Sequence, residues 1–307
     1  MLFNTIEFVM FFAVVCTTLV LFKIRQFQIV FLLFSSYFFF YFTSNYLIIL
    51  LLFTTIWNFY LAKAISNSKN KVKRKYILII NLVGSLGLLG LFKYADFGIE
   101  QFNNLAHYVG LTEIPYLDLI LPIGISFYTF QALSYTLDVY RGKLTPSKSF
   151  MEFAFFVAFF PQLVAGPILR ANDFLPQLRE KMNIAATSLQ QALIHNSNLK
   201  LGVTIMAFGF MKKMFIADNI APLVNEVFKF PIGYDSFTII IATIAFGTQI
   251  YADFSGYTDI AIGAALILGF KIPANFNKPF FATSPSDFWT RWHISLSTWV
   301  RDYCYFP

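Results

Sequence analysis

Long runs of apolar residues constrain this chain more than any other feature of its sequence. A helix that crosses the hydrocarbon of a bilayer needs about 20 mostly apolar residues, because only helices and closed barrels satisfy their own backbone hydrogen bonds in lipid. Segments such as 47–53 and 77–80 are apolar on every side, without the alternation of barrel strands. Only 13% of the residues are charged and 57% are hydrophobic, which leaves too little polar surface for a soluble globule. The sequence therefore predicts an all-α, polytopic integral membrane protein.

The lengths of these runs predict eight or nine membrane spans. They are placed at 6–22, 29–42, 46–62, 76–92, 116–137, 151–169, 201–216, 237–251 and 260–270. Up to residue 150, basic loops alternate with loops that lack lysine and arginine, as expected when basic loops stay in the cytoplasm. Lys23 and Arg25 follow the first run rather than precede it, so we interpret that run as an uncleaved helix. These loops account for the net charge of +7, and no nucleic-acid partner is predicted.

A helix break is predicted within residues 160–167. Pro161, Gly166 and Pro167 interrupt an apolar stretch there, and proline removes a backbone donor from the helical ladder. Irregular backbone at membrane depth persists only where protein buries it or water lines it. A re-entrant or broken helix is therefore expected, and it leaves the membrane side of residues 170–198 undecided.

Polar residues gather at 248–259, between two apolar runs. On a helix, Gln249, Asp253 and Tyr257 share one face because they are four residues apart. Polar groups at membrane depth are costly and usually face a protein interior or a wet cavity. A short loop between two helices is the alternative interpretation of this stretch.

Residues 284–303 hold a second concentration of polar and aromatic side chains. Ser284 as N-cap, Pro285 in the first turn and Asp287 at the third position are typical of a helix start. Asp287 and Arg291 are spaced for an ion pair between residues i and i+4. A helix is therefore predicted to begin here.

This predicted helix would carry four residues along one stripe, namely Trp289, His293, Ser297 and Val300. An imidazole among aromatic and hydroxyl neighbours can serve as a general base near neutral pH. An amphipathic helix lying on the bilayer surface is the alternative interpretation, because tryptophan and arginine suit that location.

The remaining candidates for chemistry are few. His107 and His195 are interpreted as ordinary surface residues, and Cys16 and Cys304 have no C-x-x-C spacing. The sequence contains no G-x-S-x-G elbow, phosphate loop, dinucleotide fingerprint or H-E-x-x-H helix. We therefore predict neither a metal site nor a disulfide scaffold.

Three stretches together resemble one protein family. They are Leu-Pro-Ile-Gly-Ile-Ser-Phe-Tyr-Thr-Phe-Gln at 121–131 with Asp-Val-Tyr-Arg-Gly at 138–142, Phe-Pro-Gln-Leu-Val-Ala-Gly-Pro-Ile-Leu-Arg at 160–170, and Asp-Phe-Ser-Gly-Tyr-Thr-Asp at 253–259 with Phe-Trp-Thr-Arg-Trp-His-Ile-Ser-Leu-Ser at 288–297. In this order they look like the membrane-bound O-acyltransferases, specifically the bacterial branch that includes the alginate O-acetyltransferases. The resemblance covers residues 118–307.

The resemblance implies a helical bundle that encloses a tunnel, with N-terminal transmembrane helices at 1–116 and a partial family core at 117–307. It implies an O-acyltransferase that passes an acyl group, usually acetyl, to hydroxyls of an exported polysaccharide. The donor would be a cytoplasmic thioester, either acetyl-CoA or an acyl carrier, and no bound cofactor is expected. Membrane lipid and periplasmic acetyl-transfer proteins are the other expected partners, and the expected location is the bacterial inner membrane.

The resemblance also suggests roles for individual residues. His293 lies in the Trp-His-Ile-Ser-Leu-Ser element and is carried over as an auxiliary or positioning group. Channel or substrate roles are assigned to Gln249, Asp253, Tyr257, Trp289, Arg291, Trp292 and Ser297. Structural roles are assigned to Pro161, Gly166, Pro167 and Gly256.

Two other interpretations of the function stay open. The family's second histidine, in a Trp-His-Gly type element, would lie beyond Pro307, so we expect a C-terminally truncated core with little activity alone, or a nonfunctional membrane fragment. An ion-coupled transporter or flippase is the main alternative to an enzyme, with Asp253 and Asp259 binding the coupling ion.

Overall fold

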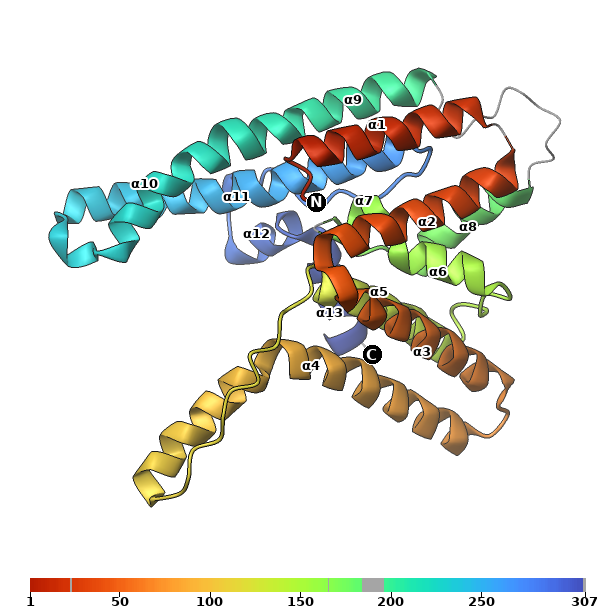
Figure 1. Cartoon of the computed structure of the whole chain (residues 1–307), viewed down its shortest axis with the longest axis horizontal. Helices are drawn as coiled ribbons and strands as arrows, with labels where there is room; N and C mark the ends of the chain where they lie inside the picture. The colour runs from red at the N-terminus through yellow and green to blue at the C-terminus, as the bar shows by residue number, and fades with distance from the viewer. Residues whose placement is uncertain (23, 165, 184–195, 306–307) are drawn as a thin grey trace. The chain divides into compact units, whose positions relative to one another are not determined.

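The computed structural model describes residues 1–22, 24–164, 166–183 and 196–305 (Figure 1). All regular elements in these ranges are helices, which confirms the predicted all-α class. The chain divides into two compact units, one built from Met1–Thr43 with Phe159–Pro307 and the other from Ser44–Ala158. The predicted division at residue 116 concerns where the family core begins, and it stays a prediction.

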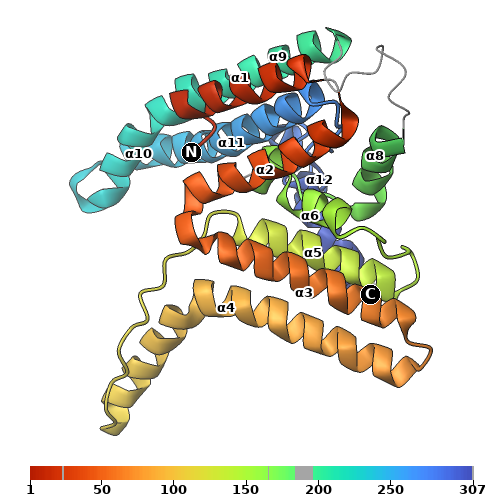
Figure 2. The same cartoon turned by 45° about the vertical axis from the view of Figure 1, so that its right-hand side comes forward.

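The unit Ser44–Ala158 is a bundle of helices. After a 3-10 turn at Asn45–Leu47 it contains α3 (Ile48–Asn67), α4 (Lys71–Val109), α5 (Ile125–Tyr140) and α6 (Phe150–Ala158). Helix α3 lies against both α4 and α5 (Figure 2). The Asn70 side chain caps α4, and Gly110 ends it in the left-handed conformation that glycine adopts most easily.

A polar network joins α3, α4 and α5 at Asn58, whose side chain is fully buried. Its Oδ1 accepts hydrogen bonds from Asn81 Nδ2 and Thr136 Oγ1, both at 3.0 Å. Its Nδ2 donates to Ser85 Oγ at 3.3 Å. Such bonds hold helices together in lipid, where apolar contacts between helices gain little over contacts with lipid chains. These three helices are therefore tied by polar side chains as well as by packing.

The other unit holds the remaining helices. They are α1 (Ile6–Leu21), nearly all of α2 (Arg25–Ser44), α7 (Phe160–Leu163), α8 (Ala171–Asn183), α9 (Asn196–Phe210), α10 (Asp218–Lys229), α11 (Ser236–Ile267), α12 (Pro285–Arg291) and α13 (Ile294–Val300). Wider π-helical turns lie at Met211–Ala217 and Arg301–Tyr305, and 3-10 turns at Pro231–Gly233 and Pro279–Phe281. Helices α9 and α11 run side by side (Figure 1).

Glycines let α9 and α11 approach backbone to backbone. A Cβ atom on Gly256 would lie 2.8 Å from the carbonyl oxygen of Gly209, and one on Gly209 would lie 2.7 Å from that of Gly256. Gly202 and Gly263 face each other in the same way, seven residues away along each helix. Small residues at such a crossing are typical of helix pairs in membranes.

Three described segments are long and apolar enough to cross a membrane, namely Gln26–Asn67, Lys71–Val109 and Ser236–Ile267. Helix α1 is apolar but shorter. The first of the three segments contains both α2 and α3, where two separate spans were predicted. The chain is therefore a multi-pass membrane protein, and the total of eight or nine spans stays a prediction.

The spans predicted at 237–251 and 260–270 form one helix, α11, so the prediction of two spans is wrong. The stretch between them is helical throughout, which excludes the loop alternative. Its acids have partners, because Lys213 Nζ lies 2.6 Å from Asp253 and Lys212 Nζ lies 2.6 Å from Asp259. Paired charges can stay at depth in a protein, so the helix has no need to open here.

Other predicted boundaries also shift. Helix α4 continues beyond residue 92 to Val109, and Asp96 within that extension accepts a hydrogen bond from the backbone N–H of Leu117. The span predicted at 116–137 begins late, because residues 111–124 are not helical and α5 starts after Gly124. Gly124 has φ 79°, a left-handed value that separates the irregular segment from the helix.

The helix break predicted at 160–167 is confirmed. Helix α6 ends at Ala158, α7 lasts about one turn, and no helix follows among the described residues before Ala171. Pro161 lies in the first turn of α7, where its nitrogen needs no helical partner. The residues of α7 are buried in the protein, which is the surrounding that irregular backbone would need at membrane depth. The sequence leaves the membrane side of residues 170–198 undecided. Residues 184–195 of this segment lie outside the described ranges.

Candidate functional site

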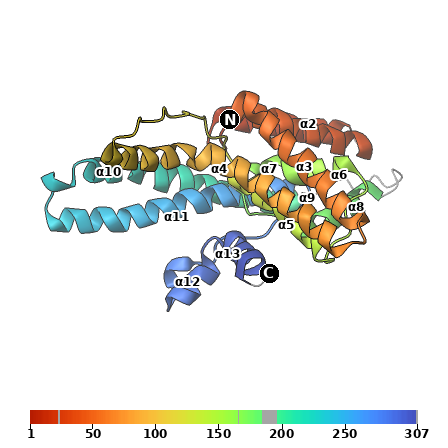
Figure 3. The same cartoon turned by 90° about the horizontal axis from the view of Figure 1, so that it is seen from below.

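Helices α12 and α13 carry the polar and aromatic residues of the last described segment (Figure 3). Ser284 Oγ caps α12 by accepting from the backbone N–H of Asp287 at 3.1 Å, and Pro285 lies in the first turn. Arg291 Nε lies 2.7 Å from Asp287 Oδ1 and holds the pKa of that carboxyl below its usual value. The predicted helix start and the predicted ion pair are both confirmed.

The predicted helix is interrupted at His293. Helix α12 ends at Arg291, α13 begins at Ile294, and His293 between them has left-handed torsions, φ 43° and ψ 53°. Such torsions strain a non-glycine residue, so surrounding contacts must hold them. Two backbone bonds of 2.9 Å do so, from Ile294 N–H to the carbonyl of Asn275 and from Asn277 N–H to the carbonyl of Arg291. The prediction of one continuous helical stripe is therefore wrong, because a neighbouring segment competes for these backbone groups.

A cavity of about 600 Å³ lies against this kink. It is lined by Trp289, Trp292, His293, Leu296, Ser297, Val300, Arg301 and Tyr305. A neighbouring cavity of about 450 Å³ shares Trp289, Ser297 and Arg301 with it. All four members of the predicted stripe line the larger cavity even though the helix is broken between them.

The His293 ring is held on two sides. Its Nδ1 lies 3.4 Å from Asn275 Oδ1, which also accepts a hydrogen bond from the backbone N–H of Ser295 at 3.1 Å. The Phe254 ring from α11 meets the imidazole edge-on, with ring centroids 4.7 Å apart and an interplanar angle of 87°. Burial lowers the pKa of His293 to about 4, so the ring is neutral at pH 7.

This arrangement favours one tautomer of the neutral imidazole. Because Asn275 Oδ1 is an acceptor, the weak contact at Nδ1 favours a proton on that nitrogen. The lone pair then resides on Nε2, the nitrogen that can accept a proton or a hydrogen bond. A ring with a pKa near 4 is a weak base. It therefore suits a positioning role better than strong base catalysis.

The other predicted channel residues lie outside both cavities. Asp253 pairs with Lys213, and the Tyr257 hydroxyl donates to a side chain near the N-terminus at 3.2 Å. Gln249 has a buried Oε1 that makes no hydrogen bond within the described part of the chain. Arg291 is occupied by its pair with an aspartate. The structure therefore brings together Trp289, Trp292, His293 and Ser297 but not these four.

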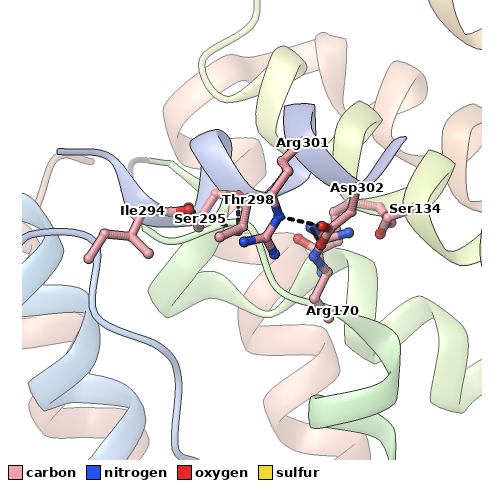
Figure 4. A network of polar contacts seen from close by, with 8 residues as sticks. Ser134, Arg170, Ile294, Ser295, Thr298, Arg301 and Asp302 are labelled. Atoms are coloured by element: carbon pink, nitrogen blue, oxygen red, sulfur yellow. Dashed lines mark hydrogen bonds and ion pairs between the residues drawn. The ribbon is translucent and has the colours of Figure 1, made fainter. Parts of the chain in front are cut away.

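An arginine pair surrounds Asp302, just after α13 (Figure 4). Arg301 Nε lies 2.8 Å from Asp302 Oδ1, and Arg170 Nη2 lies 3.3 Å from Asp302 Oδ2. The Arg170 guanidinium also stacks over the Tyr303 ring at 4.5 Å. The Arg-Asp-Tyr element at 301–303 is thereby tied to the segment that follows the helix break.

A second link joins the break to the kink. The backbone N–H of Ile168 donates to the buried Ser295 Oγ at 3.0 Å. Gly166 packs so tightly on Gln162 that a Cβ atom would collide with its backbone. The break residues therefore direct the chain to α13, although the structural roles assigned to Pro161, Gly166 and Pro167 stay predictions.

Sequence reasoning missed three residues that hold the site, namely Phe254, Asn275 and Ser295. Asn275 lies 18 residues before His293, in Pro-Ala-Asn-Phe-Asn at 273–277, where a proline followed closely by asparagines is typical of a turn. That composition indicates a loop but not its partner. Of the other histidines, His107 is exposed as predicted, and His195 lies outside the described residues.

The pKa of His293 makes a testable prediction about stability. Its folded-state pKa of about 4 lies below the ordinary 6.5, so between these values the unfolded chain binds a proton that the folded chain does not. Stability should therefore fall as pH drops from 6.5 towards 4, by about 1–2 kcal/mol at pH 5. We expect the apparent Tm in detergent to fall less between pH 7 and pH 5 for His293→Gln than for wild type. An equal fall in both proteins would contradict the prediction.

Comparison with known proteins agrees with the motifs gathered here. The sequence profile of the membrane-bound O-acyltransferase family matches residues 146–307. A probable alginate O-acetylase of Pseudomonas aeruginosa is 39% identical over 255 residues, which cover 82% of this chain and 46% of the relative. A peptidoglycan O-acetyltransferase of Helicobacter pylori is 34% identical over 276 residues, covering 82% and 50%. A teichoic acid D-alanyltransferase of Bacillus subtilis is 29% identical over 255 residues, covering 82% and 59%.

The chain spans about half the length of the curated relatives it matches. The matched region takes in more than half of the chain, including the helix break, α11, the kink and the cavity. This confirms the resemblance predicted from the motifs, and the chain belongs to the membrane-bound O-acyltransferase family.

Proposed function

We propose that the His293 cavity takes part in moving an acyl group from a thioester donor to a hydroxyl of a polysaccharide. Family membership supports this reaction class. Similar proteins are named for alginate, peptidoglycan and teichoic acid. The observation that carries the proposal is a neutral imidazole at the wall of a cavity, oriented by Asn275.

The reaction makes modest demands on the protein. The acceptor oxygen attacks the thioester carbonyl carbon, the C–S bond breaks, and the hydroxyl proton passes to the departing thiolate. Because a thioester is already activated, alignment, proton transfer and stabilisation of the oxyanion are the main requirements. With a pKa near 4, His293 fits an auxiliary or positioning role at the acceptor hydroxyl rather than that of sole base.

The proposal extends to the substrates and the location. The donor is acetyl-CoA or an acyl carrier on the cytoplasmic side of a bacterial inner membrane, and periplasmic proteins complete the transfer. Trp289, Trp292 and Ser297 contact substrate in the cavity. Gln249, Asp253, Tyr257 and Arg291 shape the protein around it.

Ion-coupled transport has less support. In that alternative Asp253 and Asp259 would bind the coupling ion. Each carboxylate has a lysine ammonium 2.6 Å away, so it is already neutralised from within the chain. A bound cation would have to displace a paired lysine at membrane depth, which is costly.

The direct test replaces His293 by alanine in the full-length protein, expressed in a bacterial strain whose own copy of the gene is deleted. Polymer O-acetylation should fall about 100-fold, in line with the loss of a proton-transfer or positioning group. His107→Ala, at an exposed histidine, is the matched control and should keep wild-type acetylation. Unchanged acetyl content in His293→Ala, at normal protein level in the membrane, would remove His293 from the site.

A further inference from the structure

Two consecutive lysines reach α11 from the turn between α9 and α10. Lys212 and Lys213 lie in the π-helical turn Met211–Ala217. Neighbouring residues of an α-helix point about 100° apart, whereas a π turn is a local rearrangement that is frequent at functional sites. The Gly209–Gly256 contact brings the two backbones together just before this turn. Both lysines are therefore close enough to α11 for their side chains to reach it.

Each lysine is bonded to an aspartate of α11. Lys212 Nζ lies 2.6 Å from Asp259 Oδ2, and Lys213 Nζ lies 2.6 Å from Asp253 Oδ1. Lys213 also lies 2.5 Å from Asp218, at the start of α10, and its side chain is only 13% exposed. Because the Lys213 side chain is nearly buried, separating it from its carboxylates would leave an unpaired buried charge, which is costly. The turn thus holds α11 at two points that lie six residues apart.

Another side of α11 contacts the candidate site. Phe254, the residue after Asp253, is the ring that meets His293 edge-on. Tyr251, three residues earlier and on the same face as Phe254, meets Trp292 with ring centroids 6.2 Å apart. The charges and the rings belong to one rigid helix. Any rotation of α11 about its axis therefore moves Phe254 relative to the imidazole.

We propose that Lys212, Lys213, Asp253 and Asp259 form a lysine clamp that fixes the rotation of α11 and so holds Phe254 against His293. In this inference, which rests on the function proposed above, the four residues are positioning residues for acyl transfer. Each ion pair engages a side chain that lies off the helix axis, so each opposes rotation of α11. Two pairs at different heights add to the backbone contacts between α9 and α11 and oppose rotation more strongly than one pair.

The test compares two aspartates that share Lys213. Asp253→Asn removes a carboxylate on α11, whereas Asp218→Asn removes one on α10 and leaves α11 anchored. The readout is the imidazole NMR signal of His293 in the detergent-solubilised full chain, identified by its loss in His293→Gln. We expect Asp253→Asn to shift this signal towards its position in Phe254→Leu, and Asp218→Asn to leave it in place. Polymer acetylation should fall about 10-fold to 100-fold in Asp253→Asn only.

A charge exchange tests the second pair. Lys212→Asp alone should shift the His293 signal, and the double variant Lys212→Asp with Asp259→Lys should return it to the wild-type position. This exchange decides the question if Asp253→Asn does not yield folded protein.

The clamp is wrong if the His293 signal stays at the wild-type position in both Asp253→Asn and Lys212→Asp, or if Asp218→Asn moves it as far as Asp253→Asn does. The signal does not depend on turnover. An absence of acyl transfer by the wild-type full-length protein would therefore overturn the proposed function and leave the test of the clamp intact.

Discussion

Gly256→Val is expected to destabilise the folded protein by more than about 3 kcal/mol and to lower its yield and apparent Tm well below those of wild type. A Cβ at this position would lie 2.8 Å from the carbonyl oxygen of Gly209, 3.0 Å from the backbone nitrogen of Lys213 and 3.2 Å from its Cβ. Two of these atoms belong to the backbone, so relief requires α9 and α11 to separate. Overpacking of this kind costs about 1–3 kcal/mol for a few carbon atoms, and valine adds further methyl groups to the same collision. Since a domain is stable by only about 5–15 kcal/mol, a loss of more than 3 kcal/mol is severe.

The same helix offers a matched control. Gly247 also lies in α11, but a Cβ atom there would have no neighbour within 4 Å. Gly247→Val changes helix propensity by the same amount without a collision, so its Tm should stay within a few degrees of wild type. The measurement is the yield of monodisperse protein in detergent and its apparent Tm. Equal behaviour of the two variants would show that α9 and α11 do not cross in backbone contact at Gly256.

Local sequence signals were sufficient for some parts of the site. The start of α12 at Ser284 and the ion pair between Asp287 and Arg291 each involve residues within four positions of one another. Capping and i,i+4 pairing are decided by the helix itself, so the pattern alone predicts them. The break near Pro161 belongs to the same class, because proline acts on its own turn.

Other parts depend on contacts between distant residues. The helix is interrupted at His293 because the backbone carbonyl of Asn275, 18 residues earlier, accepts a hydrogen bond from the backbone N–H of Ile294. The stretch 248–259 resembles a loop in composition, but Lys213 and Asp253 neutralise each other across 40 residues of sequence. Helix periodicity carries no information about either partner. The sequence could therefore predict which residue types form the site, but not which of them meet.

Asn275→Leu is expected to reduce acyl transfer about 100-fold, because a small misplacement of a functional group can cost that much. Asn275 is fully buried, and its Oδ1 lies 3.1 Å from the backbone nitrogen of Ser295 and 3.4 Å from His293 Nδ1. Leucine has a similar size but no acceptor, so the imidazole loses the contact that selects its tautomer. The unpaired N–H of Ser295 should cost about 1–3 kcal/mol of stability. The kink itself should persist, because Ile294 bonds to the backbone carbonyl of residue 275 in any variant.

Two further variants separate orientation of His293 from general damage. Asn277→Leu changes an exposed side chain in the same loop and should retain wild-type transfer. Asn275→Asp keeps an acceptor opposite Nδ1 and adds a negative charge, which favours the imidazolium and should raise the pKa of His293 above about 4. The acidic limb of the pH profile for polymer acetylation should then move to higher pH. A profile that is unchanged in Asn275→Asp, together with full transfer in Asn275→Leu, would mean that Asn275 supports the backbone kink and does not orient the histidine.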